Sequence, residues 1–237
     1  MLMAALCCTA PLAWAGDLSR LSDFDFPSGD ITQNAARITQ VGNHNTASID
    51  QGPAEPGMID RQYADIAQMG EGNQATVLQK GDQNQVRISQ DGWDFAYVSQ
   101  QGAGNKADLV QRSDTQAAFQ RLDGNTFSAT QAGNNNTING NGINTTTGNR
   151  DESSFGPAIQ SGLRNSITVV QNNDGNNLSM LQDGNDNVII YTQNGENTAH
   201  LSQKGNGNSI NYTPPAGLNV DVAQKGGESY GLSVKVN

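Results

Sequence analysis

The sequence predicts an all-β protein that folds as a single-domain β-solenoid of stacked two-strand coils. Three observations support this fold class. A short motif recurs about every eleven residues, apolar and amide residues alternate with polar ones inside each copy, and a glycine separates successive copies. Two copies make one coil of about 22 residues, and stacked coils bury a core that no single copy could build.

The motif is clearest between Gln68 and Gln111, where four copies follow one another. Its form is Gln-x-Gly-x-x-Asn-x-Ala-x-Φ-x-Gln, in which Φ is aliphatic and the last Gln opens the next copy. The Asn, the small residue, the aliphatic residue and the final Gln stand at i, i+2, i+4 and i+6, the spacing of side chains on one face of a strand. The residues between them are mostly polar, so we expect a half-buried strand with its amides facing inward.

Glycine occupies the position just after each strand, where the chain must turn. Glycine reaches positive φ without a steric cost, so it is the residue expected at a tight corner. The predicted turn glycines are Gly42, Gly70, Gly81, Gly92, Gly102, Gly133, Gly162, Gly184, Gly195 and Gly205.

The inward amides have a physical use in a stack of coils. In register, each inward Gln lies about 4.8 Å from another Gln, and side-chain amides carry both donors and an acceptor. They can therefore form continuous hydrogen-bonded ladders, in a cross-β arrangement like that of amyloid. The predicted structural amide ladder comprises Gln40, Asn45, Gln51, Gln68, Asn73, Gln79, Asn84, Gln90, Gln100, Asn105, Gln111, Gln120, Asn125, Gln131, Gln160, Asn165, Gln171, Asn176, Gln182, Asn187, Gln193, Asn197, Gln203 and Asn208.

The motif resembles the curlin repeat of the amyloid subunits of bacterial curli fibres. The match is carried by Gln68, Gly70, Asn73, Ala75 and Gln79, and again by Gln193, Gly195, Asn197, Ala199 and Gln203. The resemblance implies a secreted structural subunit that polymerises through open solenoid ends into extracellular, cell-surface fibres for adhesion and biofilm matrix. It also implies four partners: further copies of the chain, a second curlin-like subunit, an outer-membrane secretion channel and accessory export proteins.

The repeats define the expected organisation of the chain. Residues 1–15 are apolar and end in Ala-Trp-Ala, which predicts a secretory signal peptide, although no Lys or Arg precedes Arg20. Residues 16–30 form a polar leader and residues 31–237 the solenoid. Proline, glycine and threonine clusters predict inserted loops near 52–61, 112–119, 140–158 and 213–219.

Composition argues against most other functions. The net charge is -10 and the sequence pI is about 4.4, so the electrostatic requirement for binding nucleic acid is missing. No segment after residue 15 is apolar enough to span a membrane. Cys7 and Cys8 both lie in the predicted signal peptide, so the mature chain is expected to have no disulfide and no thiolate metal site.

We predict no enzyme activity, no cofactor and no metal site. His44 and His200 are expected at outward positions between strand residues. Asp183, Asn185 and Asn187 begin like a calcium loop but lack its glycine and its closing Glu. Some β-helices hydrolyse polysaccharides with paired carboxylates, but strands of Ala and Asn build too small a core for that class.

Two alternatives stay open at this point. Irregular insertions and an atypical last repeat favour a minor or divergent fibre subunit over a major one. A capped, monomeric β-solenoid that acts as a cell-surface adhesin or binds a ligand or surface is the alternative from a different class. The chain shows no amphipathic capping helix, so we expect unpaired strand edges at both ends.

Overall fold

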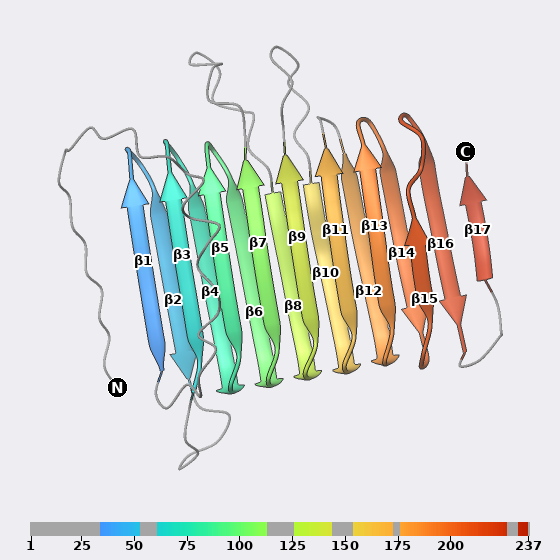
Figure 1. Ribbon diagram of the computed structural model, residues 1–237, viewed down its shortest axis with the longest axis horizontal. Helices are drawn as coiled ribbons and strands as arrows, with labels where there is room; N and C mark the ends of the chain where they lie inside the picture. The colour runs from blue at the N-terminus through green and yellow to red at the C-terminus, as the bar shows by residue number, and fades with distance from the viewer. Residues whose placement is uncertain are drawn as a thin grey trace.

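The computed structural model describes residues 34–52, 61–112, 126–143, 154–172, 176–226 and 232–236. The predicted signal peptide, the polar leader and two of the predicted ladder residues, Gln120 and Asn125, lie outside these ranges. The described residues form two β-sheets, and successive strands alternate between the sheets (Figure 1). The prediction of an all-β solenoid is therefore confirmed.

The first sheet, called here the odd sheet, contains the eight odd-numbered strands from β1 to β15. Their bounds are β1 Ala35–Val41, β3 Tyr63–Met69, β5 Gln85–Asp91, β7 Lys106–Arg112, β9 Thr137–Ile143, β11 Ser166–Asn172, β13 Val188–Asn194 and β15 Ser209–Tyr212. The second, the even sheet, contains the even-numbered strands and β17 at one edge. Their bounds are β2 Thr46–Gly52, β4 Gln74–Asp82, β6 Phe95–Ala103, β8 Thr126–Asn134, β10 Ser154–Leu163, β12 Asn177–Asn185, β14 Thr198–Lys204, β16 Asn219–Lys225 and β17 Leu232–Val236.

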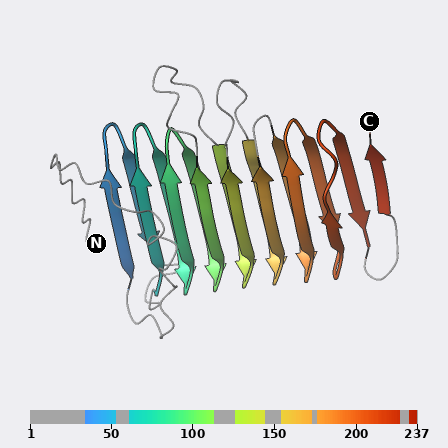
Figure 2. The same ribbon diagram turned by 45° about the horizontal axis from the view of Figure 1, so that its top comes forward.

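Every neighbouring pair is parallel except the antiparallel pair of β16 and β17, and the parallel pairs are in register apart from a shift within β10. Glutamine is placed against glutamine: Gln68 pairs with Gln90, and Gln79 pairs with Gln100. These partners are 22 and 21 residues apart, the length expected for one coil. The two sheets form two layers that face each other along the rod (Figures 1 and 2).

Insertions change the length of some coils, but the glutamines of successive coils stay aligned. Gln40 and Gln68 are 28 residues apart and Gln100 and Gln131 are 31 apart, yet each pair remains hydrogen-bonded. The interruption expected near 140–158 is shorter than predicted, because β9 continues to Ile143 and β10 begins at Ser154. β10 accommodates its extra residues by a register shift between Phe155 and Ala158.

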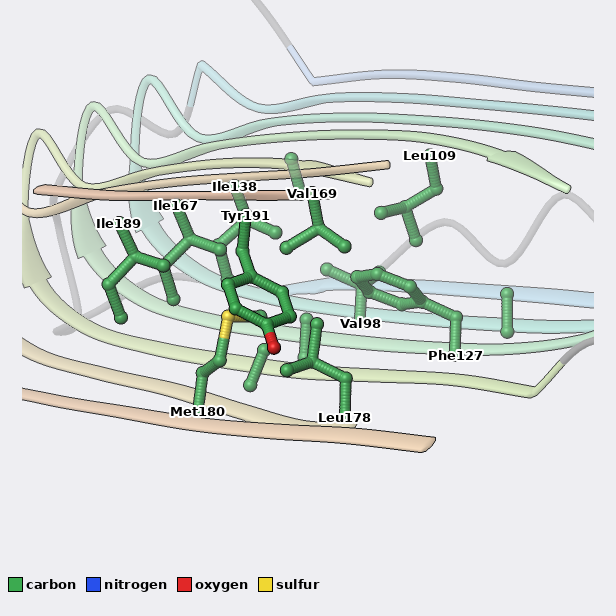
Figure 3. Packing of buried hydrophobic residues seen from close by; sticks show 14 of the residues in the cluster. Val98, Leu109, Phe127, Ile138, Ile167, Val169, Leu178, Met180, Ile189 and Tyr191 are labelled. Atoms are coloured by element: carbon green, nitrogen blue, oxygen red, sulfur yellow. The ribbon is translucent and has the colours of Figure 1, made fainter. Parts of the chain in front are cut away.

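The core is a narrow double row of small and aliphatic side chains between the sheets. In most strands two inward positions supply it, as Val86 and Ile88 do on β5, and both of these residues are fully buried. Larger residues enter toward the C-terminal half, where Met180, Ile189 and Tyr191 pack together (Figure 3). The core is thus thin, and the amides at the ends of each strand have to be satisfied inside it.

Candidate functional site

Glutamines of the even sheet form one continuous ladder along the rod. Each Nε2 donates to Oε1 of the glutamine in the next coil toward the C-terminus, over 2.7 to 3.0 Å. Most also donate to a backbone carbonyl of the odd sheet, as Gln79 does to Tyr63 O at 3.1 Å. The ladder runs through Gln51, Gln79, Gln100, Gln131, Gln160, Gln182, Gln203 and Gln224.

The odd sheet carries a shorter ladder of the same kind. Gln40, Gln68, Gln90 and Gln111 are joined by bonds of 2.7 to 3.0 Å, and Gln171 donates to Gln193 at 2.9 Å. Between these two groups the register position belongs to Gly142, which pairs with Gln111 on one side and Gln171 on the other. The series is therefore interrupted once, in the middle of the rod.

The asparagines join the corners of successive coils rather than the strands. Asn105 illustrates the pattern: its Oδ1 accepts from the backbone N of Asn136 at 3.1 Å, and its Nδ2 donates to Gly133 O at 2.9 Å. Side-chain contacts between asparagines also occur, as from Asn187 Nδ2 to Asn165 Oδ1 at 3.0 Å. Asparagine therefore supports the turn of the next coil, a role that the predicted ladder did not separate from that of glutamine.

Burial of the predicted amides is nearly complete within the rod and lower at its N-terminal end. The buried members are Gln68, Asn73, Gln79, Asn84, Gln90, Gln100, Asn105, Gln111, Gln131, Gln160, Asn165, Gln171, Asn176, Gln182, Asn187, Gln193, Asn197 and Gln203. Gln40 is exposed, and Asn45, Gln51 and Asn208 are half-buried. This gradient follows their place in the stack, since the first three belong to the first coil.

Four further residues belong to the amide system. Gln62 takes an asparagine position and is fully buried, with Nε2 2.9 Å from Gly52 O. Asp94 takes another asparagine position, and its backbone N donates to Asn73 Oδ1 at 3.1 Å. Asn136 and Gln224 stand at ordinary repeat spacing, which was the signal that could have placed them in the predicted set.

The turn glycines are held tightly by the neighbouring coil. All ten predicted glycines have positive φ, for example +115° at Gly102. A Cβ atom added there would lie 2.0 Å from the carbonyl oxygen of Gly133 in the next coil. Both the backbone conformation and the close approach of coils therefore require glycine at this corner.

The alternation of apolar and polar residues predicts a solvated outer face. The outer face of the odd sheet is not uniformly solvated. Arg87, one of the polar residues between the inward positions, forms a bidentate ion pair with Asp108 on the next strand. Gln85 is half-buried, and its Oε1 has no hydrogen-bond partner. The parallel register explains this result, because outward residues stack at strand spacing just as inward ones do.

Further ion pairs join successive coils near the turns. Arg61 and Asp82 are 2.6 Å apart, and the guanidinium holds the pKa of Asp82 below its usual value. Arg164 and Asp186 are also 2.6 Å apart, and the same cause lowers the pKa of Asp186. Ion pairs at the surface are screened by solvent, so each of these pairs contributes little to stability.

The described residues offer little for catalysis. His200 is exposed at an outward position, with its Nδ1 2.5 Å from Ser179 Oγ. His44 lies in the turn after β1 with φ of +58°, not between strand residues as predicted. Burial raises the pKa of Tyr191, whose hydroxyl has no hydrogen-bond partner. Within the described ranges, no group of three or more His, Cys, Asp or Glu could hold a metal ion.

The two ends of the rod differ. At the N-terminal end, β1 is exposed along its whole length and Ile38 is 43% exposed, with no described strand beyond β1 or β2. At the C-terminal end, β17 pairs with β16 in antiparallel orientation (Figure 1). The expectation of two open ends is therefore wrong for the even sheet, because a strand of the same chain covers its last edge.

No helix among the described residues is long and apolar enough to cross a membrane. A search of curated proteins finds no match for the chain. Residues 60–92 match the family model described as the curlin associated repeat. These residues span β3, β4 and β5 and contain six of the amides and three of the turn glycines described above: Gln62, Gln68, Asn73, Gln79, Asn84, Gln90, Gly70, Gly81 and Gly92. The predicted resemblance is confirmed there, and the chain carries a curlin associated repeat.

Proposed function

We propose that the chain is a structural subunit of curli-like fibres and that it polymerises by stacking coil on coil. The observation that carries this proposal is the even-sheet ladder, in which every glutamine donates to the next in one direction. A ladder with fixed direction can continue from one molecule into another only head to tail. Stacking of this kind is an open assembly that does not close on itself.

The N-terminal end supports the same proposal. β1 and β2 leave main-chain donors and acceptors at the edges of both sheets, and such edges template another strand. The inward side chains of β1 are exposed there, so a further coil would bury them. No catalytic group is needed for this role.

The cellular setting is part of the proposal. We place the fibre outside the cell, after removal of residues 1–15 and passage through an outer-membrane channel with accessory export proteins. A second curlin-like subunit is the expected heterologous partner, and adhesion and biofilm matrix are the expected roles. The resemblance of the repeat supports these assignments.

A second candidate function is a capped, monomeric solenoid that binds a surface or ligand. The observation that favours it is β17, which covers the last edge of the even sheet. Natural β-proteins use such covering elements to prevent association edge to edge. This candidate predicts a chain that remains monomeric at every concentration.

Incubation of the purified chain over a concentration series separates the two functions. Fibres that bind thioflavin, grow faster at higher concentration and give a reflection at about 4.7 to 4.8 Å support the fibre subunit. Size-exclusion chromatography that recovers only monomer, even after addition of sonicated fibre seeds, supports the capped solenoid and rejects the fibre role.

A further inference from the structure

We propose that β17 is a displaceable cap, which blocks the C-terminal end of the rod against the N-terminal end of a second copy of this chain. The inference rests on the proposed function, since it specifies where and how one subunit adds to the next. It also accounts for a fibre subunit that carries a covering strand on one of its ends.

β17 covers its neighbour less completely than any other strand of the even sheet. It pairs with β16 over five residues, whereas β14 pairs with β16 over seven. It runs antiparallel, so it does not continue the coil, and it lies beside the even sheet only (Figure 1). The edge of β15 in the odd sheet is not covered by any described strand. Displacing β17 therefore breaks one short strand pair and no coil.

The covered edge matches the first coil of a second copy. Each even strand is aligned with the next by its glutamine, so Gln51 of a second copy would be aligned with Gln224. The same register places the other inward residues of β2 against those of β16. Ala47, Ile49 and Gln51 would lie against Val220, Val222 and Gln224.

The amide ladder favours the second copy over the cap. Gln224 accepts from Gln203 at 2.7 Å and donates to Ser209 O at 2.9 Å. The residue paired with Gln224 in β17 is Leu232, which has no amide. Gln51 of a second copy would offer its Oε1 to Gln224 Nε2, as each glutamine of this row does to the one before it. The incoming chain thus extends a ladder that the cap ends.

The odd sheet tolerates the same junction. Continuing its register aligns Ile210 with Ala36 and Tyr212 with Ile38 of the second copy. Pro214 then stands at the glutamine position, so the odd-sheet ladder is interrupted there. An interruption of this kind already exists inside the rod at Gly142, where the sheet remains in register. A missing glutamine at this position is therefore compatible with continued stacking of the odd sheet.

A disulfide lock tests the cap directly. Val222 and Val234 are paired across β16 and β17, so Val222→Cys with Val234→Cys can bridge the strands, in a background with Cys7→Ser and Cys8→Ser. The oxidised chain is expected to form no fibres and the reduced chain to form them, because a locked β17 excludes every head-to-tail junction. Val222→Cys alone in the same background is the control for loss of the valine, and it should grow fibres in both redox states.

The opposite variant weakens the cap. Val234→Pro removes a strand donor from β17, and Ser229→Pro, placed before the strand, is its matched control. Minor conformers are typically populated at about 10% or less, so freeing the edge is expected to speed fibre elongation on seeds at least about tenfold. Equal fibre growth by the oxidised and reduced lock variants would overturn the proposed role of β17 as a cap, but not the proposed function. Failure of the wild-type, reduced and Val234→Pro chains to form fibres would overturn the proposed function itself.

Discussion

Phe127 fills the space that Gly140 leaves on the facing sheet. A Cβ atom built on Gly140 would lie 2.6 Å from Phe127 Cε2. Gly140 stands in register between Leu109 and Val169, so the coils on either side carry an aliphatic residue where it has none (Figure 3). On the even sheet, Phe127 is aligned with the much smaller Ala96. A large residue on one sheet thus compensates a missing side chain on the other.

This compensation predicts strong coupling between the two positions. Phe127→Ala should lower the free energy of unfolding by about 3 to 5 kcal/mol through a cavity, and Gly140→Leu by about 1 to 3 kcal/mol through overpacking. The double variant should lose clearly less than the sum, because the new leucine occupies the emptied space. Urea unfolding measures all three, with the exposed Phe95→Ala as control. Additive losses would show that the two residues do not share one space.

The close contact of coils at the turns predicts different costs for three glycines. Gly102→Ala introduces a backbone clash and strains a positive φ, so it should destabilise by more than about 2 kcal/mol. At Gly207, φ is +68° but nothing lies within 4 Å of an added Cβ, so about 1 to 2 kcal/mol is expected. Gly52→Ala meets neither problem and should be nearly neutral. Thermal and urea unfolding rank the three, and equal costs would exclude the proposed contact between coils.

Replacing one inner rung of the ladder should cost far more than replacing its exposed neighbour. Gln100→Leu removes the acceptor of Gln79 and the donor to Gln131, and it leaves one N–H of the Gln79 amide and Oε1 of Gln131 without these partners. Each such group costs about 1 to 3 kcal/mol. Gln101→Leu on the outer face is the control, since its side chain is exposed. Similar losses of stability for the two variants would mean that the ladder does not stabilise the stack.

Acid should weaken the contacts between coils. The folded-state pKa of Asp82 is lowered chiefly by Arg61, so its contribution is present above the unfolded pKa of about 3.9 and is lost as the pH falls through the lower folded value. The urea midpoint should therefore fall as the pH is lowered below about 4. Asp82→Asn should reduce this dependence and cost roughly 0.5 kcal/mol at pH 7. A variant with the same acid profile as the wild type would rule out the ion pair as a source.

Periodicity is why the architecture could be predicted from the sequence. A strand such as Gln85–Asp91 alternates strictly, so which residues face inward follows from one position in the motif. Parallel stacking then aligns identical positions, which places Gln68 against Gln90 without any further information. Short-range pattern and long-range pairing are the same signal in a solenoid, and this is unusual among folds.

The features that escaped prediction are those that the motif does not encode. Gln62 follows an insertion and breaks the consensus, so its burial depends on which coil lies next to it. The pairing of Arg87 with Asp108 depends on outward residues, which the pattern treats simply as polar. β17 carries no glutamine, and its antiparallel pairing with β16 depends on tertiary contacts, which local periodicity does not predict.

Mass per unit length, measured on unstained fibres by scanning transmission electron microscopy, tests head-to-tail stacking most directly. The odd sheet has eight strands, so one molecule should span about 38 Å at a spacing of about 4.8 Å. With a chain of 25.0 kDa, a single rod is predicted to weigh about 0.65 kDa per Å. A value of about 5 kDa per Å, which corresponds to one whole molecule for each strand spacing of about 4.8 Å, would contradict stacking of coils end to end.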